Sequence, residues 1–444
     1  MLFNTKLLLV LLLCCLSFMG SAQTLNKAKL DSLFTALADH NKAMGSIILS
    51  QNGVVVYSRS IGYENIAGAT KTPATSATRY RIGSVSKMFT AVMIFQLIEE
   101  GKLTLATPLA TYFPQLPNAK SITIGTLLSH RSGLGDFTKD AAYQTYLSQP
   151  KTETEIVALI SQTKPTSEPN AKFEYSNSNY VVLGYIIERV TKQPYGKALQ
   201  QRIVSKAGLK DTYHGEKIDP KRHESNSYRF VSSWQPASET DMSIPGGAGV
   251  VVSTPTDMTQ FIEALFMGKL VSKQSLDQMT TITDGYGMGM IQFPLGTKRA
   301  YGHNGSIDGF ASMLAYFPAE KLVIAYCTNG QAYPINDIMI GVLSIYFQVP
   351  YQIPRFKAAP ILSPAEIARY AGMYASTQMP LKIEVTAKGA ALQAQATGQP
   401  ALPLTLVDKD TFTFDPAGIR MVFAPDRREM LLKQGGRSYL FKME

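Results

Sequence analysis

The chain has 444 residues, of which 45% are hydrophobic and 17% charged. This composition excludes an intrinsically disordered chain, which would carry few hydrophobic residues and a high net charge. The net charge is +10, but the basic residues are scattered, without a basic stripe or a finger pattern. Nucleic-acid binding is therefore not expected, whereas proximity to an anionic cell wall or membrane surface stays open.

Residues 1–22 have the pattern of a cleaved signal peptide. Lys6 supplies a positive charge, residues 7–18 form an apolar run, and residues 20–22 are small, as a signal peptidase requires. The run is too short to cross a bilayer, which needs about 20 apolar residues. A lipoprotein signal is the weaker alternative, because neither cysteine of residues 14–15 follows a suitable small residue. We therefore expect an exported protein, either periplasmic or secreted.

The first elements of the mature chain are a helix and a hairpin. Residues 25–43 show the spacing of an amphipathic helix. Residues 46–49 and 54–57 are apolar runs joined through Asn52-Gly53, and this dipeptide between two such runs predicts a β-hairpin.

The middle of the chain is predicted to be mostly helical, and strands return near its end. Residues 84–100 form a helix that is apolar nearly all round, and Gly101 closes it, so we expect this helix to be buried. Strand-like runs occupy residues 288–293, 313–317 and 322–327, and an amphipathic helix follows at 335–347. Strands at both ends of a domain with helices between them predict one antiparallel sheet built from distant parts of the chain.

The C-terminal part is predicted to be a separate small β domain. Four prolines between residues 350 and 364 indicate a linker. Six short apolar runs follow, separated by turn residues, and their spacing predicts a small antiparallel sheet or barrel. We therefore divide the chain into a signal peptide at 1–22, a main domain at 23–349, a linker at 350–364 and a β-rich, barrel-like domain at 365–444.

Ser84 and Lys87 open the predicted buried helix and form the first candidate for catalysis. Positions i and i+3 share one face of a helix, so Lys87 can reach the Ser84 hydroxyl. A lysine can take the proton of a serine if burial disfavours its charge. The same spacing occurs at Ser148 and Ser161, but both lie in polar, turn-like stretches, so the context selects Ser84.

Two further stretches carry groups that could complete a site. In Tyr175-Ser176-Asn177 a phenol could relay a proton and an amide could orient a substrate carbonyl. In the stretch 301–306, small residues around His303 would let a substrate lie against a strand edge. Each stretch alone is more often structural. The other four histidines lack such a setting, and Cys327 ends an apolar run, which favours a buried and inert thiol.

The three motifs in this order resemble the serine β-lactamase and penicillin-recognising hydrolases, specifically their peptidase S12-like branch. Residues 127–134, 246–249 and 286–289 add to a resemblance that covers residues 25–348. It implies an α/β (α+β) fold, in which helices flank an antiparallel sheet and an all-helical subdomain is added. The fold and chemistry of the family need no metal and no cofactor.

The resemblance also implies a role for each residue of the motifs. Ser84 would be the acylated nucleophile, Lys87 its activator, and Tyr175 the group that passes a proton to the leaving group. The remaining residues would bind substrate or line the oxyanion hole: Asn177, His303, Gly305 and Ser306. Two departures from the family pattern are His303, where many β-lactamases have a lysine, and Asn170, where a glycine is common.

These observations predict an exported serine hydrolase that acts on a small-molecule or peptide substrate through an acyl-enzyme. A neutral histidine anchors a substrate carboxylate less firmly than a lysine, which speaks against efficient β-lactam turnover and favours a peptidase or esterase. The leading specific form is a DD-carboxypeptidase-like enzyme acting on D-amino-acid peptides, or on related amides and esters. β-Lactamase and carboxylesterase activities are the alternatives. An alternative of another class is a binding protein that keeps the scaffold with little chemistry. The oligomeric state stays open.

Overall fold

The computed structural model describes residues 25–231, 233–356, 362–389, 391–399, 401–414, 417–434 and 437–444. The predicted signal peptide lies outside the described residues, so export stays a prediction. Within the described ranges, no helix has both the length and the apolar character that crossing a membrane requires.

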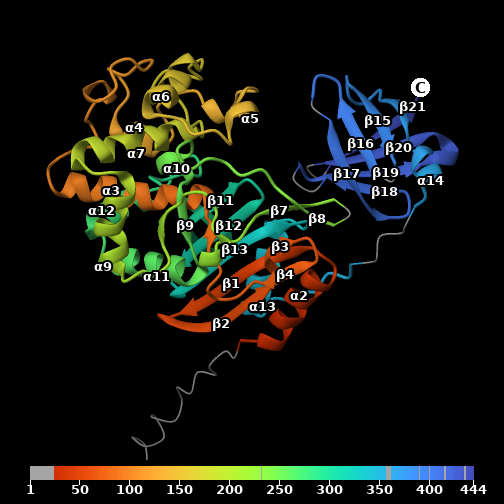
Figure 1. Cartoon of the computed structure of the whole chain (residues 1–444), viewed down its shortest axis with the longest axis horizontal. Helices are drawn as coiled ribbons and strands as arrows, with labels where there is room; N and C mark the ends of the chain where they lie inside the picture. The colour runs from red at the N-terminus through yellow and green to blue at the C-terminus, as the bar shows by residue number, and fades with distance from the viewer. Residues whose placement is uncertain are drawn as a thin grey trace, which may run out of the picture.

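One antiparallel sheet joins the two ends of the main domain (Figure 1). Its strand order is β10-β11-β12-β13-β1-β2, so the N-terminal hairpin pairs with a strand more than 270 residues later, as in Ala43↔Gln331. Asn52 and Gly53 take φ values of 53° and 78°, which form the predicted tight turn. The strands are β1 (Ala43–Gln51), β2 (Val54–Ile61), β10 (Ile291–Leu295), β11 (Lys298–Ile307), β12 (Phe310–Phe317) and β13 (Leu322–Gln331).

The sheet differs from the prediction at β10, which begins at Ile291 rather than at residue 288. Gly289 takes a φ of 80°, so the chain turns there instead of extending. A short hairpin also adds to the sheet, since β7 (Tyr228–Phe230) pairs in parallel with β13 and antiparallel with β8 (Trp234–Pro236).

Helices cover both faces of the sheet and form two cores. On one face, α2 (Lys27–Asp39) and α13 (Ile335–Tyr346) pack over apolar residues of β1, β12 and β13. The other face is covered by α3 (Ser86–Glu99) and α11 (Pro255–Phe266), and this core continues into the helical region. Every residue of α3 from Ser86 to Leu97 is buried, as its apolar sequence predicted.

The helical region lies between the two halves of the sheet in sequence and at one side of it in space (Figure 1). Its largest helix is α7 (Asn177–Thr191), which packs against α3 and α4. The other helices are α4 (Ile124–Leu128), α5 (Tyr143–Tyr146), α6 (Glu153–Gln162), α8 (Tyr195–Leu199), α9 (Ser205–Ala207), α10 (Gly246–Gly249) and α12 (Lys273–Thr280). Short strands complete the domain: β3 (Tyr63–Ala67), β4 (Thr70–Pro73), β5 (Tyr80–Arg81), β6 (Tyr213–His214) and β9 (Val251–Ser253).

The C-terminal part folds into a closed antiparallel barrel after the short helix α14 (Pro364–Ala368). Closure comes from a pairing that the sequence did not predict, Tyr374↔Met443, between the first and last strands. These two strands were missed because the first is short and the last carries charged residues. A closed barrel leaves no free strand edge. Its strands are β14 (Gly372–Ala375), β15 (Lys382–Lys388), β16 (Ala391–Ala396), β17 (Leu402–Asp408), β18 (Thr411–Phe414), β19 (Ile419–Ala424), β20 (Glu429–Gln434) and β21 (Arg437–Met443).

Candidate active site

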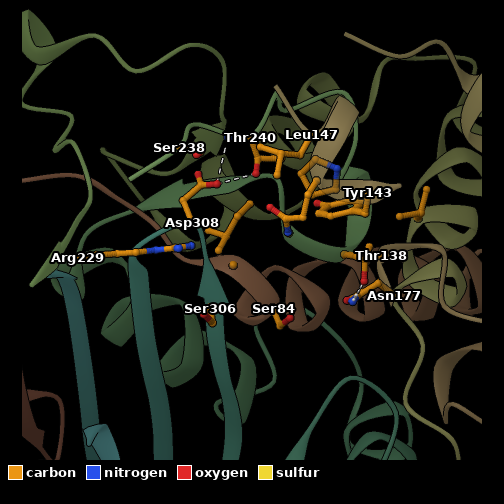
Figure 2. A pocket seen from close by; sticks show the side chains of 17 residues that line it. Ser84, Thr138, Tyr143, Leu147, Asn177, Arg229, Ser238, Thr240, Ser306 and Asp308 are labelled. Atoms are coloured by element: carbon orange, nitrogen blue, oxygen red, sulfur yellow. Dashed lines mark hydrogen bonds between the residues drawn. The ribbon is translucent and has the colours of Figure 1, made fainter. Parts of the chain in front are cut away.

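Ser84 lies at the wall of a cavity of about 330 Å³ between the sheet and the helical region (Figure 2). It sits in η1 (Gly83–Val85), a single 3-10 turn that leads directly into α3. The predicted helix therefore begins two residues after Ser84, and the serine is presented on the turn before it. Asn177 and Ser306 line the same cavity.

Lys87 contacts Ser84 as the i, i+3 spacing predicted. The Lys87 Nζ lies 2.9 Å from Ser84 Oγ, 2.8 Å from Asn177 Oδ1 and 3.0 Å from the Ala248 carbonyl oxygen. These three acceptors match the three N–H groups of an ammonium, so the lysine side chain has one well-defined position. The other two serines of the same spacing are not placed in this way: Ser148 and Ser161 donate to backbone carbonyl groups.

The third acceptor of Lys87 depends on close packing of α10 against α7. A Cβ built on Gly247 would lie 2.5 Å from the Tyr180 carbonyl oxygen, closer than real Cβ atoms approach. Only glycine therefore lets this turn lie against α7, where it presents Ala248 to the lysine. The family-like stretch 246–249 thus positions a backbone carbonyl group that contacts Lys87 beside Ser84.

Burial lowers the pKa of Lys87 to about 7, and the nearby charge of Asp136 opposes this shift. The side chain is 0% exposed, so the charged form loses its hydration. A lysine with this pKa is partly neutral near pH 7, and the neutral amine has a lone pair that can accept a proton.

Tyr175 lies beside the lysine. The Lys87 Nζ is 5.0 Å from the centre of the Tyr175 ring. Burial raises the pKa of Tyr175, a neighbouring Ser84 side chain opposes that rise, and the charge of Asp136 adds to it. The phenol is therefore protonated at neutral pH and can donate a proton rather than take one.

Asn177 is held in one orientation by both ends of its amide. Its Oδ1 accepts from Lys87, and its Nδ2 donates to Asp136 Oδ2 at 3.2 Å and to Thr138 Oγ1 at 3.0 Å. Asp136 in turn accepts from the backbone N–H of Thr138. The sequence analysis did not find Asp136, because a lone acidic residue in a polar loop carries no distinctive spacing.

The end of β11 passes close to Ser84. A Cβ built on Gly305 would lie 3.0 Å from Ser84 N and 2.1 Å from the Ile82 carbonyl oxygen, so a side chain there would push the strand away from η1. A Cβ on Gly83 would likewise lie 2.8 Å from Ser306 N. The backbone N–H groups of Ser84 and Ser306 therefore belong to neighbouring segments, as a two-donor oxyanion hole requires.

The same stretch of β11 has a free edge. β12 pairs with β11 from Tyr301 to Ile307, whereas β10 pairs only with Lys298–Gly302. From His303 to Ile307 the outer side of β11 thus has no strand partner among the described residues. An extended substrate could pair with this edge.

His303 is buried rather than exposed to the cavity. It is 1% exposed, its Nδ1 donates to the Asn304 carbonyl oxygen, and its Nε2 accepts from the Tyr286 hydroxyl at 3.1 Å. Burial lowers the pKa of His303 to about 3, with Lys87 adding to the shift and the Asn304 carbonyl opposing it. The imidazole is therefore neutral over the whole physiological range.

His130 also belongs to this region, although the sequence analysis set it aside. It is 0% exposed, and its ring lies 4.2 Å from that of Tyr175 and 4.7 Å from that of Tyr286, measured between ring centres. Its Nδ1 accepts from the backbone N–H of Ser176, and burial holds its pKa well below the usual value. The family-like stretch 127–134 was the available signal. His130 therefore packs behind Tyr175 as a neutral ring.

Two further residues near the site have structural roles. Ser86 accepts a hydrogen bond from the backbone N–H of Val251 at 3.0 Å and ties α3 to β9. Asn170 takes a φ of 66°, a left-handed conformation that explains why a glycine would also suit this position.

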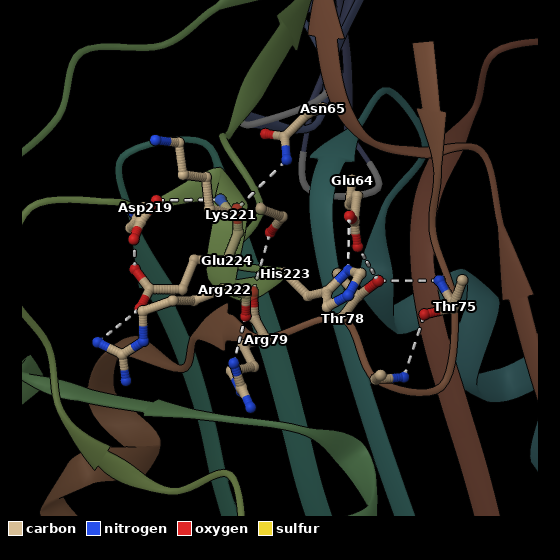
Figure 3. Close-up of polar contacts among 12 residues, drawn as sticks. Glu64, Asn65, Thr75, Thr78, Arg79, Asp219, Lys221, Arg222, His223 and Glu224 are labelled. Atoms are coloured by element: carbon tan, nitrogen blue, oxygen red, sulfur yellow. Dashed lines mark hydrogen bonds and ion pairs between the residues drawn. The ribbon is translucent and has the colours of Figure 1, made fainter.

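The segment that leads into Ser84 is anchored by a network of polar contacts (Figure 3). Glu64 is buried and accepts from Thr78 Oγ1 at 2.6 Å, and its other oxygen lies 3.1 Å from His223 Nδ1. Arg79 pairs with Asp211 at 2.6 Å. Together these contacts hold both sides of the loop that precedes β5, a few residues before Ser84.

A sheet with helices on both faces and a serine in contact with a buried lysine are typical of a serine hydrolase of the penicillin-recognising type. The family model described as Beta-lactamase matches residues 30–338, and the chain belongs to this family. Penicillin-binding protein 4* of Bacillus subtilis (strain 168) is 26% identical over 417 residues, which cover 85% of this chain and 90% of that protein.

Solved structures agree with this assignment. D-amino acid amidase from Ochrobactrum anthropi SV3, in complex with D-phenylalanine, has a TM-score of 0.63 and 27% identity, over 73% of this chain and 100% of the amidase. The octameric penicillin-binding protein homologue from Pyrococcus abyssi has a TM-score of 0.63 and 24% identity over 94% of this chain and 100% of its own. The last match includes the barrel and supports the fold alone.

Proposed function

We propose that the protein hydrolyses amide bonds of D-amino-acid peptides and D-aminoacyl amides through an acyl-enzyme on Ser84. The observation that carries this proposal is the 2.9 Å contact between Ser84 Oγ and a buried Lys87 Nζ whose pKa is lowered to about 7. The amidase from Ochrobactrum anthropi and penicillin-binding protein 4* support the substrate class, since the first is named as a D-amino acid amidase and the second as a penicillin-binding protein.

Acylation begins with transfer of the Ser84 proton to neutral Lys87. The amine keeps its contacts with Asn177 and Ala248 while its lone pair accepts the hydroxyl proton. Ser84 Oγ then attacks the substrate carbonyl carbon, and the resulting oxyanion accepts from the N–H groups of Ser84 and Ser306. Loss of one such donor typically costs about 2.7–4 kcal/mol of transition-state stabilisation.

Collapse of the tetrahedral intermediate needs a proton on the leaving nitrogen. Tyr175 is the donor in this scheme, because its phenol is protonated at neutral pH and lies beside Lys87. The lysine can then return the serine proton to the phenolate, so each group is ready for deacylation by water. This second step uses the same groups in the reverse order.

A neutral His303 would bind a substrate carboxylate only weakly, so the site favours amides that do not depend on such a contact. The imidazole is neutral and its two nitrogens are occupied by Asn304 and Tyr286. A β-lactamase-like anchor would require a cation at this end of the strand. We therefore propose amide hydrolysis as the main activity. Carboxylesterase activity is the second candidate and efficient β-lactam turnover the third.

The test combines a substrate panel with a mass measurement. The amides of D-alanine and D-phenylalanine, their L-enantiomers and a D-Ala-D-Ala peptide are incubated with the wild type and with Ser84→Ala. We expect hydrolysis of D-configured amides, loss of at least a thousandfold in Ser84→Ala, and a penicillin adduct that maps to Ser84. Hydrolysis of L-amides alone would reject the substrate class. Equal activity of Ser84→Ala would reject the mechanism, and an inert serine with intact fold would favour a binding protein.

A further inference from the structure

The cavity beside Ser84 has Arg229 and Asp308 at one end (Figure 2). It is lined by Ser84 and Ser306, but neither Tyr175 nor His303 is among its lining residues in the described part of the chain. The proposed proton donor to the leaving group therefore stands outside this cavity. β11 also continues from Ser306 toward Asp308, away from His303. In the proposed mechanism, the cavity therefore lies on the acyl side of the scissile bond.

Arg229 stands at the end of this cavity. It comes from β7, and Figure 2 shows its side chain extending toward Asp308, on the side opposite Asn177. The residue is exposed, and among the described residues its guanidinium makes no ion pair and no hydrogen bond. Most other arginines of the main domain are paired, for example Arg59 with Asp31 and Arg79 with Asp211.

The nearest acidic group does not neutralise Arg229, because it is already fully engaged. Asp308 accepts from the backbone N–H and the hydroxyl of Thr240 through Oδ1, and from Arg81 through Oδ2 at 3.1 Å. Arg81 is 2% exposed and also donates to Glu239 at 2.7 Å. Arg81 therefore holds Asp308 and Glu239 together, and the guanidinium of Arg229 at the end of the cavity makes no direct pair with either carboxylate among the described residues.

We propose that Arg229 determines specificity by binding a carboxylate on the acyl portion of the substrate. The preferred donors would then be D-aminoacyl amides or peptides that carry an acidic group on the N-terminal side of the scissile bond. A planar guanidinium can bind a carboxylate through two parallel hydrogen bonds. Ser238 lines the same end of the cavity and offers a hydroxyl to the same group. This inference rests on the proposed function of Ser84.

Tyr143, Leu147 and Val181 contribute apolar surface to a wall of the same cavity. This wall suits the methylene groups that separate an amide from a distal carboxylate, as in a succinyl or glutaryl chain. The cavity therefore combines an apolar wall with a cation at its far end, a combination that recognises a short acidic acyl chain rather than a free amine.

The test compares two substrates that differ only in this charge: N-succinyl-D-alanine p-nitroanilide and its neutral succinamoyl analogue. The wild type should prefer the anionic substrate about tenfold or more in kcat/KM, and added salt should weaken the preference. Arg229→Gln should bring the ratio close to one, with Arg229→Lys between them. Arg420→Gln removes the same charge from an exposed position on barrel strand β19 and should keep the wild-type ratio.

The outcomes separate this proposal from the proposed function. Equal Ser84-dependent turnover of both substrates by the wild type would overturn the role of Arg229 and leave the hydrolase mechanism intact. If Arg229→Gln kept the wild-type preference in kcat/KM for the anionic substrate, the role of Arg229 would also be overturned. If the wild type hydrolysed neither substrate nor any D-aminoacyl amide of the panel, the proposed function itself would fail, and the role of Arg229 with it.

Discussion

The surroundings of Ser84 and the interior of the C-terminal barrel use burial in opposite ways. The barrel interior is filled by apolar and aromatic side chains such as Tyr374, Phe412 and Phe441, and its buried polar side chains among the described residues are threonines. Around Ser84 the buried residues include Lys87, His130 and His303, each at most 1% exposed. The barrel contains no histidine at all in its sequence.

This difference indicates that the main domain is less stable at its candidate site than a purely apolar interior would be. Burying a group that can carry a charge is unfavourable unless it is neutral or well paired. The main domain buries such groups beside the end of β11. There, lowered pKa values keep Lys87 partly neutral and His303 fully neutral. Among its described residues, the barrel interior holds no buried histidine, lysine, arginine or carboxylate.

The largest expected effect comes from removing the buried base. Lys87→Met keeps an unbranched side chain of similar length but has no basic nitrogen to accept the Ser84 proton. We expect acylation of Ser84 to slow by about 10³- to 10⁴-fold, with little loss of fold. Rapid-quench mass spectrometry with a D-aminoacyl ester measures the rate. An acylation rate within tenfold of the wild type would assign the base to another residue.

A substitution in the barrel core should destabilise the barrel but leave the acylation of Ser84 unchanged. Phe412 is 1% exposed and packs against Tyr370 and Phe423, with ring centres 5.0 and 5.6 Å away. Phe412→Ala should lower the free energy of unfolding of the barrel by about 3–5 kcal/mol. The barrel core shares no residue with the two cores of the main domain, so acylation of Ser84 should persist.

Calorimetry and limited proteolysis measure the stability of the barrel, and mass spectrometry measures the acylation of Ser84. Leu440→Ala, at a 40% exposed position of the same barrel, is the matched control and should cost about 1 kcal/mol or less. Loss of Ser84 acylation in Phe412→Ala at temperatures where the main domain stays folded would contradict the independence of the two regions.

Acid should destabilise the main domain through its buried histidines. The pKa of His303 is about 3 in the folded protein and about 6.5 in an unfolded chain, so the unfolded state binds more protons between these values. The free energy of unfolding therefore falls as the pH drops through this window, by up to about 1.4 kcal/mol per pH unit for one such group. His130 acts in the same direction.

Trp234, the single tryptophan, lies in the main domain and reports its unfolding in urea at pH 7, 5.5 and 4.5. His303→Gln should make the dependence on pH shallower in this window, whereas His40→Gln, at an exposed position, should leave it unchanged. An unchanged slope in His303→Gln would mean that this imidazole takes up its proton without unfolding.

The smallest expected effect concerns the hydroxyl that holds His303. Tyr286→Phe leaves the buried Nε2 without its 3.1 Å partner, which should cost about 1–3 kcal/mol of stability and lower turnover several-fold. Tyr301→Phe, two residues before His303 on β11, is the control, because its hydroxyl contacts Gln292 instead. If both variants lost the same activity, the hydroxyl of Tyr286 would have no special role.

The features that could be predicted from the sequence are those that residues close together in the chain determine. The turn at Asn52-Gly53, the buried helix after Ser84 and the Ser84–Lys87 pair all depend on short-range geometry. The closing strands of the barrel could not be predicted in this way, because their pairing joins Tyr374 to Met443 and depends on the whole sheet.

The supporting residues of the site were missed for the same reason. His130 and Asp136 lie far from Ser84 in sequence, and only the packing of α4 and α7 brings them to Tyr175 and Asn177. Arg229 was missed because nothing in a short exposed strand marks a residue as part of a cavity. Such residues are recognised by their three-dimensional neighbours rather than by spacing.

The central claim is that a partly neutral Lys87 takes the proton of Ser84, and the dependence of the acylation rate on pH tests it most directly. Protonated Lys87 cannot act as the base, so the single-turnover rate should rise with pH and level off above the pKa of about 7. The Lys87→Met variant should be slow at every pH and should lack this rise. A wild-type rate that is flat from pH 5.5 to 9, or a rise that persists in Lys87→Met, would contradict the account.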